Sequence, residues 1–229
     1  MLMLEAPNQY RNKELNDLVI GIVGGTGAQG RGLGYRLAMA GFKVILGSRD
    51  SNKASAAALY LGHSIIGTDN QGCAAQADIV IIALPWDGHR ESVTALKSHL
   101  DGKIVIDCVN PLGFDQGGAF PLTVVEGSAG AQAQGILTQS HVVAAFNHVS
   151  AILLSDQSLD EVEIDIMVAG DDKAATDLVQ SMIYKIKGMR GIYAGKMRNA
   201  GQIEALTANL ISMNRRYKTH TGFRITGIN

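Results

Sequence analysis

Short apolar runs alternate with amphipathic segments along this chain of 229 residues, a spacing typical of strands that alternate with helices. Residues 18–23 predict a first strand, the stretch that follows to residue 40 predicts a helix, and residues 44–46 predict a second strand. After its first residue, the run 78–84 is continuously apolar and rich in β-branched side chains, as in strands buried on both faces of a parallel sheet. The pattern predicts an α/β protein with a doubly wound parallel sheet.

The later segments extend this pattern and then change it. Strands are expected at 64–66, 103–108 and 141–145, and helices at 54–61, 70–76, 86–100 and 132–137, with a glycine-rich loop at 112–130. A strand is expected at 162–168, and the alternating acids Glu161, Glu163 and Asp165, which begin just before it, predict one wet face. Asp171 and Asp172 can cap a helix that runs through residue 186, and a strand at 191–194 and a helix at 199–214 follow. We expect a main domain over 1–152, with 1–16 as a polar extension, and a second, smaller α/β domain over 153–229.

A glycine-rich turn between the first strand and the first helix matches the pattern G-x-G-x-x-G. In a strand–turn–helix unit this pattern binds the pyrophosphate of a dinucleotide, whereas elsewhere it is often a structural turn. Gly25 is expected to permit the tight turn, Gly27 to let the backbone approach the pyrophosphate, and Gly30 to let the helix pack on the strand. The N–H groups that open the helix would bind the phosphates. The predicted phosphate-binding residues are Gly25, Thr26, Gly27, Ala28, Gln29 and Gly30.

The end of the second strand indicates which dinucleotide binds. An NAD site usually places Asp or Glu there to bind the ribose 2′-hydroxyl, but this chain has Ser48 and Arg49, with Lys53 one helical turn further on. A carboxylate would repel a 2′-phosphate, whereas a hydroxyl, a guanidinium and an ammonium can all donate hydrogen bonds to it. The residues favour NADP, and the alternative is that Arg49 and Lys53 are solvated loop charges.

Composition narrows the class of protein. No apolar run approaches the ~18 residues of a membrane helix, and the acidic N-terminal segment is not typical of a secretory signal. Cys73 and Cys108 have neither metal-ligand spacing nor the numbers of a disulfide framework, which favours buried thiols in a reducing cytoplasm. We therefore expect a cytoplasmic enzyme with no metal site and no membrane partner.

Positive charge is concentrated near the C-terminal end. From residue 178 onwards the one acid is Glu204, against nine lysines and arginines. Such a segment can attract an anionic ligand or nucleic acid, although exposed helix faces often carry similar charge. The basic residues are Lys185, Lys187, Arg190, Lys196, Arg198, Arg215, Arg216, Lys218 and Arg224.

At several points the chain resembles the F420-dependent NADP oxidoreductases, the family of NADPH-dependent coenzyme F420 reductases. The resemblance runs from about residue 17 to the C-terminus, so it exceeds a shared dinucleotide motif. It rests on the stretches GTGAQGRGL (25–33), GSRDSNKA (47–54), ALPWDGH (83–89), VNPL (109–112), VVAAFNHVSA (142–151), VAGDDKAA (168–175) and GMRGIYAGKMRNAGQIEALT (188–207). The family often reads AFNN or ALHT where this chain has AFNH at 145–148.

The resemblance implies two coenzymes, NADP(H) and F420, and a hydride that passes between them. It implies that Thr26, Ser48, Arg49 and Lys53 surround the adenosine 2′-phosphate, and that the deazaflavin lies over the nicotinamide, between the strand ends and the small lobe. No general base is required, because the coenzymes themselves donate and accept the hydride. The expected residues around the two reacting rings are Leu84, Pro85, Trp86, Asn110, Asn147 and His148.

One of these residues, His148, is the best candidate for a chemical role. It would donate a hydrogen bond to a ring carbonyl or to N1 of the deazaflavin, where negative charge develops; the alternative is that it is a hydrogen-bonded residue of the wall. No other side chain is expected to act in catalysis.

Other functions remain open at this stage. A flavin or ferric reductase, a hydroxyacid or imino-acid reductase, and a non-catalytic NADP sensor all share the first lobe. Hydroxyacid and imino-acid reductases append a long helical domain, whereas about 75 residues that alternate strand and helix follow Ser155 here. We expect a homodimer whose partners are small-molecule coenzymes and not nucleic acid.

Overall fold

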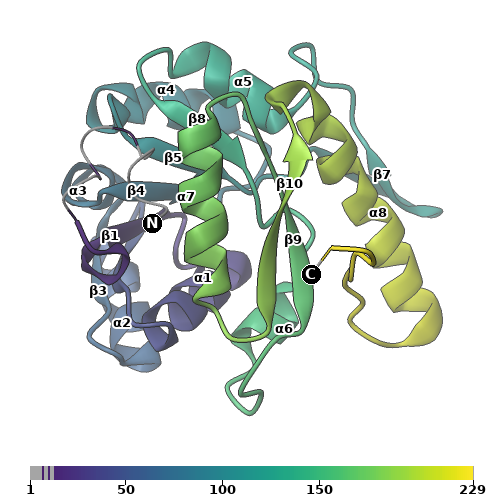
Figure 1. Ribbon diagram of the computed structural model, residues 1–229, viewed down its shortest axis with the longest axis horizontal. Coiled ribbons are helices and arrows are strands. Elements are labelled where there is room, and N and C mark those ends of the chain that lie inside the picture. The colour runs from purple at the N-terminus through teal and green to yellow at the C-terminus, as the bar shows by residue number, and fades with distance from the viewer. Residues whose placement is uncertain (1–6, 8–9, 11–12, 229) are drawn as a thin grey trace.

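Eight strands form one twisted sheet in the order β10-β9-β8-β5-β4-β1-β2-β3 (Figure 1). The computed structural model describes residues 7, 10 and 13–228. Neighbouring strands are parallel except for β8 and β9. The strands are β1 Val19–Val23, β2 Lys43–Ser48, β3 Ile66–Asp69, β4 Ile79–Ile82, β5 Ile104–Asp107, β8 His141–Ala144, β9 Ile164–Gly170 and β10 Met189–Gly195. The predicted doubly wound α/β fold is confirmed.

Helices cover both faces of this sheet, and a separate apolar cluster lies beneath each layer. One cluster packs under α1, α2 and α7, and the other under α3, α4 and α5. Strand β4 serves both, because Ile79 and Ile81 face the first cluster while Val80 and Ile82 face the second. The helices are α1 Ala28–Met39, α2 Ser51–Leu61, α3 Asn70–Gln76, α4 His89–Leu100, α5 Ala129–Ile136, α6 Ala151–Ser155, α7 Lys173–Tyr184 and α8 Ala200–Tyr217, with 3-10 turns at Leu15–Asp17 and Met197–Asn199.

The strand order reverses next to β1, which lies between β2 and β4. From β1 the chain proceeds to β2 and β3 on one side, and then crosses back to β4 and β5 on the other. Loops that leave β1 and β4 therefore diverge above the carboxyl ends of the strands, and such a divergence opens the crevice in which doubly wound sheets bind ligands.

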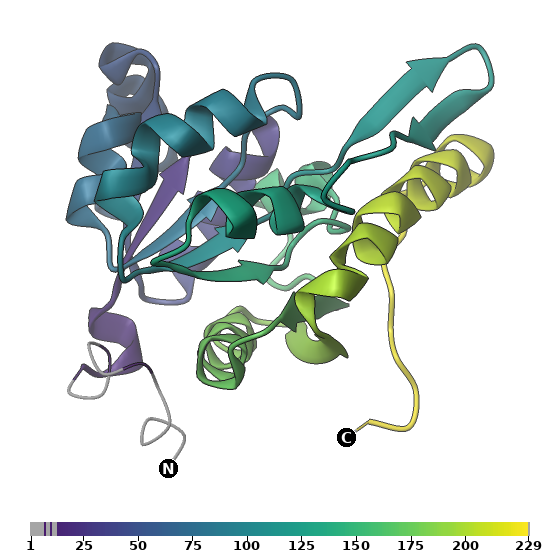
Figure 2. The ribbon, with the colours of Figure 1, turned by 90° about the horizontal axis from the view of Figure 1, so that it is seen from above.

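Several local predictions were wrong. The segment 112–130, expected as a loop, contains an antiparallel hairpin of β6 (Leu112–Asp115) and β7 (Gly118–Pro121). Helix α4 begins at His89 and not at residue 86, because Gly88 adopts a left-handed backbone with φ 82°. The third strand is β3, Ile66–Asp69, and not residues 64–66. The hairpin lies beside α8, and together they project from the body of the molecule (Figure 2).

The C-terminal part shares the main sheet, since β9 pairs with β8 and β10 pairs with β9. The proposed division after residue 152 falls within α6 and stays a prediction. The predicted wet face of the β9 region is wrong at Asp165, which is completely buried. Its charge is balanced by Arg190 and Arg224, which are remote in sequence, so the alternation of acids does not indicate solvent exposure at this position.

Two long-range anchors fix the periphery of the sheet. The buried guanidinium of Arg36 on α1 donates to carbonyl oxygens in the segment that contains and follows α6, at distances of 2.7–3.0 Å. Most of the predicted polar extension, 1–16, lies outside the described residues, but Tyr10 is buried and its hydroxyl donates to the carbonyl of Asp78. Among the described residues, no helix is long and apolar enough to cross a membrane.

Candidate functional site

The glycines of the turn between β1 and α1 are closely packed, except at Gly27, where there is space for a ligand or a side chain. Gly24, and not Gly25, adopts the left-handed conformation, with φ 78°. Gly25 and Gly30 are close-packed, since a Cβ on Gly30 would lie 2.7 Å from the carbonyl oxygen of Gly24. At Gly27 the nearest atom to such a Cβ is 3.4 Å away, and this residue is exposed at the N-cap of α1. The open position therefore coincides with unpaired N–H groups at the start of α1.

The predicted NADP-selective residues gather near this turn. The hydroxyls of Thr26 and Ser48 are 3.5 Å apart, which places the glycine turn next to the end of β2. Arg49 and Lys53 are exposed, and neither forms a salt bridge within the described part of the chain. The nearby acid, Asp50, is the N-cap of α2 and accepts hydrogen bonds from the backbone of Asn52 and Lys53. The carboxylate is thus engaged at the helix terminus, while both cations are free to contact an anion.

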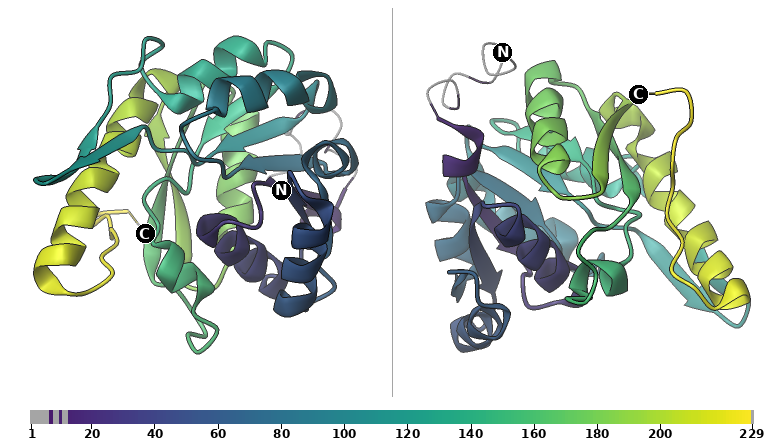
Figure 3. Two further views of the ribbon diagram at one scale, coloured as in Figure 1. Left: turned by 180° about the vertical axis from the view of Figure 1, so that it is seen from behind. Right: turned by 60° about the horizontal axis from the view of Figure 1, so that its bottom comes forward.

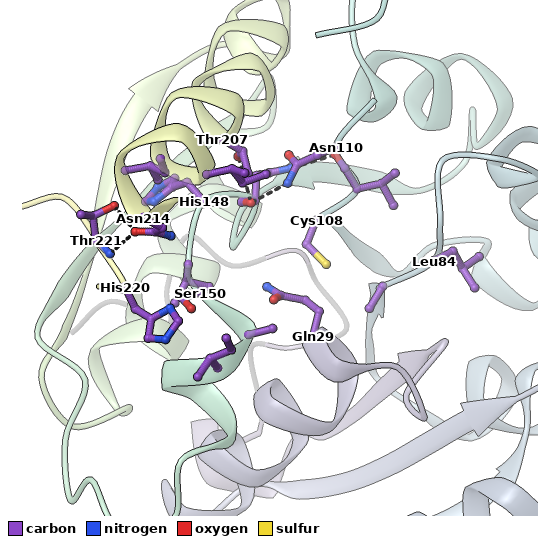
Figure 4. A pocket seen from close by; sticks show the side chains of 18 residues that line it. Gln29, Leu84, Cys108, Asn110, His148, Ser150, Thr207, Asn214, His220 and Thr221 are labelled. Carbon is purple, nitrogen blue, oxygen red and sulfur yellow. Dashed lines mark hydrogen bonds between the residues drawn. The ribbon is translucent and has the colours of Figure 1, made fainter. Parts of the chain in front are cut away.

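A cavity of about 510 Å³ lies above the carboxyl ends of the central strands (Figure 4). One side consists of Gln29 from α1, Ala83 and Leu84 after β4, and Cys108 after β5. The other side consists of α8 and the chain that follows it. The full lining is Gln29, Ala83, Leu84, Cys108, Val109, Asn110, Asn147, His148, Val149, Ser150, Ala151, Ile152, Thr207, Leu210, Ile211, Asn214, His220 and Thr221.

Hydrogen bonds to the backbone around Asn147 connect these two sides. Its carbonyl oxygen accepts from Asn110 Nδ2 at 2.6 Å and from Thr207 Oγ1 at 3.2 Å (Figure 4). The preceding residue, Phe146, has a left-handed backbone with φ 63°, and its carbonyl oxygen accepts from Gln29 Nε2 at 3.0 Å. A non-glycine residue in this conformation is strained, and such strain is typical of functional sites.

Three buried polar atoms at the cavity have no partner among the described residues: Asn110 Oδ1, Asn147 Oδ1 and His148 Nδ1. A buried polar atom without a partner costs about 1–3 kcal/mol, so such atoms indicate a place where a ligand supplies the missing hydrogen bond. The set contains amide acceptors and a ring nitrogen, which suits a ligand that carries both donor and acceptor groups on one ring.

The position of the proton on His148 follows from its neighbours. Its Nε2 accepts from the backbone N–H of Met167 at 3.1 Å, so the neutral ring carries its proton on Nδ1. Burial lowers the pKa of His148 to about 4, since desolvation disfavours the imidazolium. At neutral pH the side chain is therefore an uncharged donor at the wall of the cavity.

The structure thus unites some of the predicted residues and separates others. Gln29, Leu84, Asn110, Asn147 and His148 line the cavity. Pro85 and Trp86 are not among the lining residues, and neither are the residues at the glycine turn, the end of β2 and the start of α2: Gly25, Thr26, Gly27, Ala28, Gly30, Ser48, Arg49 and Lys53. The Trp86 ring instead stacks on His89, with ring centroids 5.6 Å apart.

Sequence reasoning missed the far wall. Thr207, Leu210 and Asn214 recur on α8 at helical spacing, which was a detectable signal for one face. His220 and Thr221 gave no such signal, because they lie in irregular chain after α8.

Buried polar contacts attach α8 to α5. The carboxylate of Glu204 on α8 accepts from the N–H groups of Ala129 and Gly130 in the first turn of α5. Beside it, His89 bonds to Asp107 at 2.8 Å and to Gln132 at 3.0 Å. Burial raises the pKa of Glu204 to about 7, against the lowering effect of the two N–H groups. The described residues contain no group of three or more histidines, cysteines or acids placed to bind a metal ion.

The sheet order, the glycine turn at the reversal point and the cavity above it define a Rossmann-type dinucleotide-binding protein. Residues 19–111 match the family model described as NADP oxidoreductase, coenzyme F420-dependent. The F420-dependent NADP reductase of Methanothermobacter thermautotrophicus is 36% identical over 221 residues, which cover 91% of this chain and 95% of that protein. The chain belongs to this family of F420-dependent NADP reductases.

Two further comparisons, one with a solved structure and one with a more distant relative, bear on this assignment. A crystal structure of a candidate F420-dependent NADP reductase from Arthrobacter sp. FB24 superposes with a TM-score of 0.77, at 26% identity, and covers 91% of this chain and 99% of that one. Metalloreductase STEAP3 of Rattus norvegicus is 28% identical over 192 residues, but the match covers 37% of that protein against 84% of this chain. The match to the Methanothermobacter F420-dependent NADP reductase is therefore higher in identity and more complete than the match to the metalloreductase.

Proposed function

We propose that this protein transfers a hydride between NADP(H) and coenzyme F420, so that NADPH, oxidised F420 and a proton give NADP⁺ and reduced F420, reversibly. The proposal rests on one observation: the glycine turn that is open at Gly27 lies next to a cavity with three buried polar atoms that have no partner among the described residues. One part suits a dinucleotide phosphate, and the other suits a polar heterocycle held above the strand ends.

The phosphate side would select NADPH. Thr26, Ser48, Arg49 and Lys53 all carry donors, and the nearby carboxylate of Asp50 already accepts two backbone N–H groups. A 2′-phosphate placed there would receive charge-assisted hydrogen bonds, whereas a 2′-hydroxyl would gain much less from the two cations. This arrangement is our basis for proposing NADP(H) and not NAD(H).

The cavity side would hold the deazaflavin against the nicotinamide. Bound together, the two coenzymes supply the hydride donor and acceptor, so the protein's contribution is to orient the rings and exclude water. Asn110, Asn147 and His148 would bond the polar edge of the deazaflavin, with His148 Nδ1–H donating where negative charge develops. Leu84 would pack against the stacked rings, and Pro85 and Trp86 would border the nicotinamide.

The experiment mixes the purified protein with NADPH and oxidised F420 and follows the loss of deazaflavin absorbance. Parallel reactions replace F420 with FMN, FAD or a ferric chelate, and NADPH with NADH. We expect rapid loss with NADPH and F420 only. Activity with a flavin or a ferric chelate but none with F420 would support the flavin or ferric reductase alternative, and nucleotide binding without any turnover would support a sensor.

We further propose a homodimer in the cytoplasm that acts on small-molecule coenzymes and not on nucleic acid. The β6–β7 hairpin lies along α8 at one end of the molecule (Figure 3), and large apolar side chains are exposed there: Phe114, Phe120, Val125 and Tyr217. A second copy would cover them, since monomers seldom expose contiguous apolar patches. Light scattering on a size-exclusion column should give twice the chain mass, and Phe114→Glu should give the mass of one chain.

A further inference from the structure

The segment that follows α8 returns to the sheet and forms part of the cavity wall. This segment, residues 218–228, is called the strap below (yellow in Figures 2 and 3). Helix α8 ends where Lys218 adopts a left-handed backbone with φ 51°, which reverses the chain. Asn214 Oδ1 then accepts from both the N–H and the hydroxyl of Thr221, at 2.6 and 2.8 Å. The turn is fixed in place, and His220 and Thr221 line the cavity.

Asp165 on β9 is the main attachment point of the strap. The carboxylate is completely buried and accepts from Arg190 Nε and Nη2 at 2.7 and 2.6 Å, from Arg224 Nη1 at 3.1 Å, and from the N–H of Ile225 at 2.6 Å. Its own N–H donates to the carbonyl of Phe223 at 2.8 Å. These donors, Arg190 first, hold the pKa of Asp165 to about 2. The carboxylate is therefore ionised at any working pH and binds both the side chain and the backbone of the strap.

Arg190 extends the same attachment. Its guanidinium also donates to the carbonyl oxygens of Ile225 and Ile228, at 3.0 and 2.7 Å. No residue of the strap belongs to either apolar cluster of the sheet, and polar contacts to Asp165 and Arg190 hold it in place. Removal of the Asp165 charge would leave two arginines without their shared partner.

The strap reaches the cavity through His148. The Phe223 ring meets the His148 ring edge to face, with centroids 5.4 Å apart and planes at 76°. On its other side His148 is held by the N–H of Met167, two residues after Asp165 on β9. The imidazole is therefore held between β9 and the strap. Both contacts depend on residues 165–167 of β9, because Met167 binds the ring and Asp165 binds the strap.

We propose that Asp165 is a positioning residue for F420: it latches the strap to β9, and the latched strap orients His148 and completes the F420 wall of the cavity. The inference rests on the proposed function, because it assigns the α8 side of the cavity to F420. Release of the latch would free Phe223, loosen the His148 ring and open the wall at His220 and Thr221. The phosphate turn and the end of β2 are not part of this wall, so NADPH binding should be spared.

The first test compares Asp165→Asn with the wild-type protein. Fluorescence titration should show F420 affinity reduced by at least about tenfold, a loss in the range expected when a buried charged partner is removed. NADPH affinity should stay within about twofold. Asp160→Asn is the matched control, because it makes the same chemical change in an exposed ion pair with Lys187. Equal loss for both coenzymes, or for both variants, would overturn the proposal.

The second test separates a positioning role from a merely structural one. Hydrogen exchange of the strap peptides should slow when F420 binds the wild-type protein, should stay unchanged with NADPH alone, and should show little F420 protection in Asp165→Asn. If that variant fails to fold by circular dichroism, Phe223→Ala tests the same step with the latch intact and should also weaken F420 selectively. Wild-type protein that binds F420 without protection of the strap contradicts the inference alone, whereas wild-type protein that neither binds nor reduces F420 contradicts the proposed function.

Discussion

The two sides of the site are built in different ways. The phosphate side comes from one continuous unit, in which β1, the glycine turn, α1 and β2 follow each other between Val19 and Ser48. The cavity side combines the ends of β4, β5 and β8 with α8 and the strap, and its lining residues from Ala83 to Thr221 span more than a hundred residues of the chain. A local unit can be read from spacing and glycine positions, whereas an assembled wall depends on contacts that no short stretch of sequence contains.

The largest expected effect tests the open glycine of the phosphate side. Gly27→Val should reduce NADPH affinity by more than about 100-fold, roughly 3 kcal/mol, because the side chain would occupy the space proposed for the pyrophosphate. The backbone at Gly27 is extended, with φ −69° and ψ 165°, which valine adopts without strain. Thermal unfolding should therefore change little, and F420 titration should retain its affinity. Retained NADPH affinity would remove the pyrophosphate from this turn.

Gly30 is the matched contrast within the same motif. Its added Cβ would lie 2.7 Å from the backbone of Gly24 and Gly25, so Gly30→Val should destabilise the fold itself by about 1–3 kcal/mol. A melting temperature unaffected by Gly30→Val would show that the packing role assigned to this glycine is wrong.

The next effect concerns the choice of nucleotide. Arg49→Asp should weaken NADPH by about 10- to 100-fold, since a charged hydrogen bond contributes about 1.5–3 kcal/mol and the new carboxylate repels a phosphate. NADH carries no 2′-phosphate and should be affected far less. Steady-state kinetics with both nucleotides measure the ratio, and equal losses would show that Arg49 does not contact the 2′-phosphate.

The same difference between the local turn and the assembled wall decides which features the sequence predicts. The strand–turn–helix unit, the buried β4, the close packing at Gly30 and the open space at Gly27 follow from local chemistry. The binding of phosphate at this turn stays a prediction. The burial of Asp165 could not be predicted, because its partners Arg190 and Arg224 are 25 and 59 residues away. The β6–β7 hairpin was hidden by its glycines, whose turn-forming character resembles a loop.

His148 gives the next prediction, on the assembled side. His148→Gln should raise the Michaelis constant for F420 by about tenfold, the value of one hydrogen bond of about 1.4 kcal/mol, and leave that for NADPH within twofold. Glutamine retains a donor in a different position, so the loss measures placement and not only polarity. An unchanged Michaelis constant for F420 would make His148 a residue of the wall without contact to the coenzyme.

The same histidine makes folding stability depend on pH. Its folded pKa of about 4 lies below its unfolded value of about 6.5, so the unfolded chain binds the proton first. Stability should therefore fall as the pH is lowered from about 6.5 to about 4, by roughly 3 kcal/mol from this residue. Urea unfolding at several pH values should show a shallower fall in His148→Gln, and identical slopes would contradict the buried neutral imidazole.

The smallest expected effect concerns the basic end of α8. A second cavity of about 390 Å³ shares Ile211 with the first and is lined by the hairpin tip, Ser212, Arg215 and Arg216. F420 carries an anionic phosphate and glutamate tail, and the position of this cavity fits a tail that extends from the ring site. Exposed charge pairs contribute about 0.2–1 kcal/mol, so each arginine should add only a small increment.

Arg215→Gln should therefore raise the Michaelis constant for F420 by about two- to fivefold, without effect on NADPH. The increment should grow with the number of glutamates in the tail and should shrink as salt shortens the Debye length below about 10 Å. Arg198→Gln is the control, because Arg198 is an exposed cation of the same segment that lines neither cavity. A tail-length series with the same affinity for every tail at low salt would assign the positive charge to a solvated helix end, where arginines also complement the dipole of α8.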